Sequence, residues 1–235
     1  MLGQSGYGGA REDALLDAII GRRPDGIVLT GIMHSAEGRR RLLASGIPVV
    51  ETWDLTPTPI DMLVGFSHEK VGGAVAEYLV SHGRQRLAIV TADDFRAGLR
   101  RKGFMESAKR LGVATVPDCI VPAPTTLGNG RAGLADLLGR HPDIDAVFCS
   151  SDILGLGVMT EAHARGIAVP GRFAVFGFGD LAFAADTHPA LTTVRIDGNA
   201  IGRQAARFIV ERAEGRAIAE RVIDLGFSIV KRESA

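Results

Sequence analysis

The sequence has no excess of positive or negative charge and no long apolar run, and it contains only two cysteines. Its 27 Lys and Arg balance 27 Asp and Glu, which argues against binding of a nucleic-acid backbone by this chain alone, because such binders usually carry a basic surplus. No run approaches the ~18 apolar residues of a membrane span. Cys119 and Cys149 have no CxxC partner, and Cys149 follows an apolar stretch typical of a buried, reduced thiol.

The first residues also lack the basic start and apolar stretch of a secretory signal. Together with the reduced thiol, this absence favours a cytoplasmic protein without a membrane partner. Hydrophobic residues make up 46% of the 235 residues, which is enough for a sizeable core and too much for a disordered chain. The length predicts one large or two small α/β domains.

Short β-branched segments alternate with segments of helical periodicity. Most of these short segments are continuously apolar, as in parallel strands buried on both faces. The predicted strands are residues 26–30, 48–51, 86–90, 145–149 and 173–177. Between them, apolar stripes with helical spacing, such as Val71, Val75, Tyr78 and Leu79, predict amphipathic helices.

Glycine is abundant, with 30 residues, and several glycines stand where a helix should end. Glycine adopts the left-handed conformation of a helix C-terminus without a Cβ penalty. The predicted stops are Gly83, Gly112, Gly166 and Gly215.

Repeated βα units predict a parallel sheet with helices on both faces, and ligands of such sheets bind beyond the carboxyl ends of the strands. Attention therefore falls on Thr30, on Trp53 and Asp54, and on three further stretches. These stretches are residues 91–96, 150–152 and 178–180.

Sequence motifs of enzymes are missing. A phosphate loop needs lysine after its second glycine, but Gly98 to Gly103 is followed by Phe104. No GxGxxG motif of dinucleotide binding follows a strand. His68-Glu69 has no second histidine four residues after the first, so the zinc-protease motif is missing as well. Gly3-Gln4-Ser5-Gly6 is not a nucleophile elbow. We therefore expect no catalytic residue, no cofactor and no metal.

Three groups of polar residues each allow two interpretations. Ser151 and Asp152, between a strand and a helix, fit a helix N-cap alone or a cap that also meets a ligand. Arg96 and Arg100 share one helix face, which is either solvated or grips an anionic or hydroxylated ligand. The six histidines are interpreted as solvated or capping residues.

From about Asp25 onward, the order and spacing of short segments resemble the effector-binding core of LacI-family transcriptional regulators. The matching segments are residues 22–28, 46–50, 72–83, Arg100 with Gly103 and Phe104, residues 145–148 with Asp152, residues 166–170, residues 189–194, and Gly202 with Ala205 and Ala206. Residues 51–57, 59–67 and 224–227 are similar to the gluconate-responsive repressor branch.

The resemblance implies a type I periplasmic-binding-protein fold, with two Rossmann-like subdomains, parallel sheets and three crossovers. The N-terminal subdomain is expected to comprise residues 1–66 plus 198–225, and the C-terminal subdomain residues 67–197 plus 226–235. The helix-turn-helix domain and the first βα unit of the N-terminal subdomain have no counterpart in the sequence, so we expect the chain alone not to bind an operator.

The same resemblance implies a small sugar or sugar acid bound between the subdomains. Thr30 and Asp54 match positions on the N-terminal side, and Arg96, Arg100 and Ser151 match positions on the other side, with Arg100 at the place of the family's effector-binding arginine. The family's usual ligand-contacting aspartate is Gly179 here, which leaves the adjacent Asp180 as a candidate, and a hinge aromatic is replaced by Gly198. The loss of one carboxylate favours an anionic ligand such as gluconate.

The expected function is the ligand-sensing core of a homodimeric repressor, which contacts operator DNA only through a helix-turn-helix domain. Two alternatives stay open. A sugar-binding protein of a transport system has the same fold but requires export, and a nucleotide-dependent α/β enzyme would need the phosphate motifs that are missing here.

Overall fold

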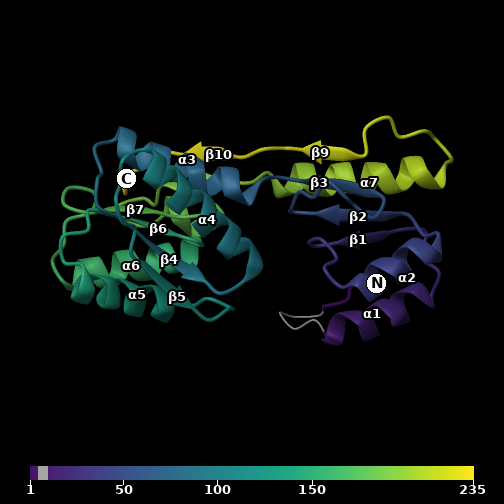
Figure 1. The fold of residues 1–235 in the computed structure, drawn as a ribbon, viewed down its shortest axis with the longest axis horizontal. Helices are drawn as coiled ribbons and strands as arrows, with labels where there is room; N and C mark the ends of the chain where they lie inside the picture. The colour runs from purple at the N-terminus through teal and green to yellow at the C-terminus, as the bar shows by residue number, and fades with distance from the viewer. Residues whose placement is uncertain (5–9) are drawn as a thin grey trace. The chain divides into compact units, whose positions relative to one another are not determined.

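A computed structural model describes residues 1–4 and 10–235 of the chain (Figure 1). The chain forms two compact units. Unit 1 comprises Met1–Ser67 and Asp197–Gly226, and unit 2 comprises His68–Ile196 and Phe227–Ala235. The chain therefore passes from one unit to the other three times, as the expected fold class requires.

Unit 1 is built on a parallel sheet of four strands in the order β1-β2-β3-β9. The strands are β1 (Ile27–Leu29), β2 (Val49–Thr52), β3 (Met62–Gly65) and β9 (Val222–Asp224), and the helices are α1 (Ala10–Ile20), α2 (Ala36–Ser45) and α7 (Gly198–Ala213). Leu16 of α1 and Leu42 of α2 are buried with Val49 of β2 in one core. Helix α7 packs on β2 and β3.

Unit 2 has a second parallel sheet, in the order β5-β4-β6-β7. Its elements are α3 (His68–Ser81), β4 (Leu87–Ala92), α4 (Phe95–Arg110), β5 (Asp118–Val121), α5 (Leu127–Arg140), β6 (Ala146–Cys149), α6 (Asp152–Ala164), β7 (Ala174–Phe176), the 3-10 helix Ala182–Ala185, β8 (Thr193–Arg195) and β10 (Ser228–Val230). Strands β8 and β10 form an antiparallel pair. Helix α3 packs on α4, and α5 packs on α6. Figure 1 shows α5 and α6 side by side near β5 and β4.

Each of the five predicted strands is present, with ends shifted by two residues at most. The sequence patterns missed β3, β5, β8, β9 and β10, which are only three or four residues long. Strands β9 and β10 have no fully buried residue, so they lack the apolar run on which the prediction depended.

The four glycines predicted to end helices all adopt positive φ, between 66° and 89°. Cys149, the predicted buried thiol, is fully buried in the core of unit 2. Within the described residues, no helix combines the length and apolar character needed to cross a bilayer.

Candidate functional site

Arg100 is a buried arginine near the carboxyl end of the unit 2 sheet. It lies on α4, which begins after the end of β4, and only 5% of its surface is exposed. Its guanidinium donates a hydrogen bond of 3.1 Å to the carbonyl of Ser150, directly after β6. The fully solvated alternative for Arg100 is therefore wrong, because α3 and the β6 end enclose it.

His68 and Phe178 also lie against this guanidinium. The His68 Nδ1 atom lies 2.8 Å from Arg100 Nη1, and the Arg100 Cζ atom stands 4.1 Å from the centre of the Phe178 ring, a cation–π distance. His68 is the first residue of α3 and is buried, so of the two roles expected for a histidine, solvated or capping, the solvated one is wrong here. No local pattern predicts this pairing, because 32 residues separate His68 from Arg100.

Ser151 caps α6 and also contacts a neighbouring loop. Its hydroxyl accepts a hydrogen bond from the Leu154 amide at 3.3 Å and lies 3.2 Å from the hydroxyl of Thr125. The predicted capping is present, and Ser151 immediately follows the residue that Arg100 contacts. A ligand contact by Ser151 stays a prediction.

Arg96 lies in the first turn of α4, one turn before Arg100, and is half-buried. The helix is capped by Asp94, whose carboxylate accepts a hydrogen bond from the Ala97 amide at 2.9 Å. Arg96, Arg100 and Ser151 therefore all follow the carboxyl ends of β4 and β6, which are neighbours in the sheet.

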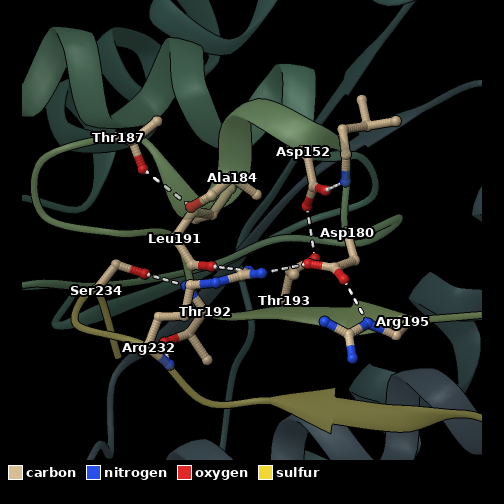
Figure 2. Close-up of polar contacts among 11 residues, drawn as sticks. Asp152, Asp180, Ala184, Thr187, Leu191, Thr192, Thr193, Arg195, Arg232 and Ser234 are labelled. Atoms are coloured by element: carbon tan, nitrogen blue, oxygen red, sulfur yellow. Dashed lines mark hydrogen bonds and ion pairs between the residues drawn. The ribbon is translucent and has the colours of Figure 1, made fainter.

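Asp180, the last of the candidate effector contacts in unit 2, follows β7 and forms ion pairs with two arginines (Figure 2). Its Oδ2 atom accepts a hydrogen bond of 2.5 Å from Arg195 Nε, and its Oδ1 atom accepts one of 2.6 Å from Arg232 Nη2. Burial alone would raise the pKa of Asp180, but the hydrogen bonds and charges of Arg232 and Arg195 outweigh it, and the pKa is lowered. Whether this carboxylate also contacts a ligand stays a prediction.

Asp152 is a fully buried carboxylate next to these ion pairs (Figure 2). It accepts hydrogen bonds from the Thr193 hydroxyl at 2.6 Å and from the Leu181 amide at 2.7 Å. Burial raises the pKa of Asp152, and these two hydrogen bonds reduce the rise without cancelling it. Asp152 therefore ties the start of α6 to β8 and to the loop that carries Asp180.

The two candidate residues in unit 1 are Thr30, which follows β1, and Asp54, which follows β2. Thr30 is exposed, whereas Asp54 is only 3% exposed. The Thr52 hydroxyl donates to the Leu29 carbonyl at 2.7 Å and so joins the two strand ends. Asp54 lies so close to β3 that a Cβ at Gly65 would meet its carbonyl oxygen at 2.0 Å, which explains why glycine ends β3.

Trp53, between Thr52 and Asp54, has a positive φ of 70°, which is strained for a residue with a bulky side chain. Its ring stands edge-on to Phe66 at 6.3 Å between centroids. A Cβ at Gly198, where the resemblance led us to expect an aromatic residue, would lie 3.4 Å from the Trp53 Cη2 atom. The tryptophan therefore occupies space beside the glycine that replaces the aromatic.

The candidates thus fall into two sets, one in each unit, and both sets lie at carboxyl ends of parallel strands. No group of three or more metal-ligating side chains occurs in the part of the chain that the structure describes. The arrangement offers hydrogen-bond donors and acceptors and a fixed positive charge, which are the groups that bind a small polar molecule.

Two parallel α/β units joined by three chain crossings define the class of periplasmic-binding-protein-like domains. The family described as "Periplasmic binding protein-like domain" matches residues 76–235. The chain belongs to the LacI family of transcriptional regulators, of which it forms the effector-binding core.

Relatives and solved structures agree with this assignment. The chain is 35% identical over 236 residues to the HTH-type transcriptional regulator GntR of Pseudomonas aeruginosa, covering all of this chain and 69% of that protein. The GntR regulator of Escherichia coli is 25% identical, over 97% of this chain and 69% of that protein. The crystal structure of GntR from Chromobacterium violaceum superposes with a TM-score of 0.94 at 35% identity, covering all of this chain and 87% of that one.

A complex of the regulator CelR with cellobiose is also similar. Its TM-score is 0.82 at 26% identity, and the match covers 97% of this chain and 71% of that one.

Proposed function

We propose that this chain senses a small sugar acid, with gluconate as the first candidate, and so controls a transcriptional regulator. The observation that carries the proposal is the buried Arg100 guanidinium, which is held by His68, Phe178 and the Ser150 carbonyl beyond the carboxyl ends of the central strands β4 and β6. An arginine fixed in this way is suited to recognise a carboxylate, because its planar fork is already oriented. The proposed role is binding, without a catalytic step.

Thr30 and Asp54 of unit 1 and Arg96, Arg100, Ser151 and Asp180 of unit 2 are the proposed contacts of the effector. Asp54 would accept hydrogen bonds from sugar hydroxyls, and the arginines would receive the acid group. Glycine at position 179, in place of the family's aspartate, removes one carboxylate that would repel an anion.

In the proposed regulator the protein acts in the cytoplasm as a homodimer and contacts operator DNA through a helix-turn-helix domain. Effector binding would favour one of two arrangements of the dimer and thereby change operator affinity. The contact with operator DNA through a helix-turn-helix domain is supported by the relatives, which are HTH-type transcriptional regulators.

The experiment is a thermal-shift titration with gluconate, other sugar acids, glucose and cellobiose. A ligand that binds the native state raises the melting temperature by mass action. We expect a saturable rise with gluconate and none with glucose. A rise only with glucose or cellobiose would overturn the sugar-acid assignment, and no rise with any sugar would overturn sensing of sugars.

The variant Arg100→Ala should abolish the gluconate shift, and Arg100→Lys should weaken it because lysine has no planar fork. Arg165→Ala is the matched control, since this arginine, which caps the far end of α6, pairs with Glu161. Circular dichroism without ligand shows whether each variant is folded. A folded Arg100→Ala protein that still responds to gluconate would exclude Arg100 from the site.

A further inference from the structure

Glu51 of β2 is a fully buried glutamate whose two carboxylate oxygens each hold a different loop. Its Oε1 atom accepts a hydrogen bond of 2.9 Å from the amide of Met33, and its Oε2 atom accepts one of 2.8 Å from the amide of Ile60. The residue is fully buried, with 0% of its surface exposed. Burial of a carboxylate costs free energy of folding unless the group is hydrogen-bonded or paired. The hydrogen bonds from the two amides offset this cost for Glu51.

Arg39 of α2 adds the positive charge that a buried carboxylate requires. Its Nη1 atom lies 3.7 Å from Glu51 Oε1, and its Nη2 atom donates a hydrogen bond of 2.6 Å to the Thr58 carbonyl. Arg39 therefore holds the loop after β2 at a second point. Glu51 and Arg39 together form what we call the loop clamp.

The two loops held by the clamp are the ones that carry the unit 1 candidates. Met33 lies in the connection from β1 to α2, three residues after Thr30, and Ile60 lies in the connection from β2 to β3, six residues after Asp54. Glu51 itself precedes Asp54 by three residues. One carboxylate thus fixes both connections from inside the unit, and its burial keeps it out of reach of solvent.

We propose that Glu51 is a positioning residue for effector binding, which holds the loops of Thr30 and Asp54 in the binding conformation without contacting the effector. This inference rests on the proposed function, because a sugar acid must bind for positioning to matter. Release of either loop transfers the entropic cost of ordering that loop to the binding step and weakens affinity.

The test uses Glu51→Gln, which keeps the size of the side chain. Glutamine has one acceptor oxygen, and its NH₂ group would face an amide N–H, so only one of the two loops stays bonded. We expect gluconate to bind about tenfold more weakly by calorimetry. Hydrogen exchange of the Met33 or Ile60 amide should be faster without ligand and return toward the wild-type rate at saturating gluconate.

A loss of stability alone would not produce this pattern. Phe208→Leu, in the buried face of α7, is the control: it should lower the melting temperature while leaving gluconate affinity and the exchange of both amides unchanged. If Glu51→Gln does not fold, Arg39→Met serves instead. Arg39 is partly exposed, and its loss should weaken binding about threefold by freeing the Thr58 contact.

The outcomes separate the two proposals. Wild-type affinity in a folded Glu51→Gln protein, or in Arg39→Met where that variant serves, would overturn the positioning role and leave sugar-acid sensing intact. Absence of gluconate binding by the wild-type protein would overturn both. Weaker binding by Phe208→Leu to the same degree as by Glu51→Gln would show that Glu51 acts through stability only and would also overturn positioning.

Discussion

Asp180 has two arginine partners from distant parts of the chain. Arg195 ends β8 and Arg232 follows β10, and both donate to the same carboxylate. The pKa of Asp180 is lowered in the folded protein. Its ionisation therefore stabilises the fold fully above the ordinary aspartate pKa of about 3.9, and that stability is lost as the pH falls through the lower, folded value.

We predict that Asp180→Asn lowers the free energy of unfolding by about 2 kcal/mol at pH 7, since hydrogen bonds to a charged group are lost. Urea denaturation at pH 7 and at successively lower pH measures the difference from wild type. The difference should shrink as the pH falls below about 4, where Asp180 of the unfolded chain takes up a proton, and should vanish below the lower pKa that Asp180 has in the folded protein. A difference that stays constant down to pH 2 would show that the charge of Asp180 contributes nothing.

Cys149 is the second residue whose environment permits a direct test. It is fully buried in the unit 2 core, and burial raises the pKa of its thiol, with a smaller contribution from Asp152. Because the thiolate is the reactive form, we predict that a thiol reagent at pH 7.5 modifies Cys149 only when unit 2 unfolds. A Cys119→Ser background isolates the reaction, and its rate should increase in urea. Rapid labelling in buffer would contradict the burial.

At the scale of elements, α3 and α4 approach each other through glycines. A Cβ on Gly103 of α4 would meet the Glu69 carbonyl of α3 at 2.0 Å, and one on Gly72 would meet the Arg100 carbonyl at the same distance. This contact places the first turn of α3, with His68, beside Arg100. The close helix packing therefore decides the surroundings of the proposed effector arginine.

We predict that Gly103→Ala destabilises the protein by about 3 kcal/mol, because both clashing groups belong to helix backbones that must move apart. Gly98→Ala is the matched control on the same helix. Nothing lies within 4 Å of its Cβ position, so this substitution should stabilise by up to about 1 kcal/mol through helix propensity. Urea titrations of the two variants should shift in opposite directions, and equal shifts would refute the packing explanation.

At the scale of the whole molecule, the proposed effector contacts are divided between two units that each have their own sheet. A ligand that binds both units stabilises both, whereas a ligand held by one unit stabilises that unit. The proposed presence of effector contacts in both units therefore leads to a prediction about unfolding.

We predict that saturating gluconate raises the melting temperatures of both units in scanning calorimetry. The single tryptophan, Trp53 of unit 1, and the labelling of Cys149 in unit 2 report on the two units separately. Glucose at the same concentration is the control. A rise reported by only one of the two probes would assign the effector to one unit and contradict a shared site.

Much of the fold could be predicted from local patterns. Apolar runs located five strands, and glycines marked four helix ends, because strand burial and helix termination depend on residues that are neighbours in sequence. The short strands β9 and β10 could not be found in this way. Their partners β3 and β8 lie far away or across a crossing of the chain, and pairing rather than composition makes them strands.

The candidate site likewise has features that follow from the sequence and features that follow only from the tertiary structure. By itself the sequence determined the fold class, the family, the strand ends that Thr30, Asp54 and Ser151 follow, and the helix that carries Arg100. Only the tertiary structure decided that Arg100 is buried against His68 and Phe178, that Asp180 is held by two arginines, and that Glu51 holds two loops. The physical reason is that burial and hydrogen-bond partners of a polar side chain are supplied by segments distant in the chain, which no local pattern records.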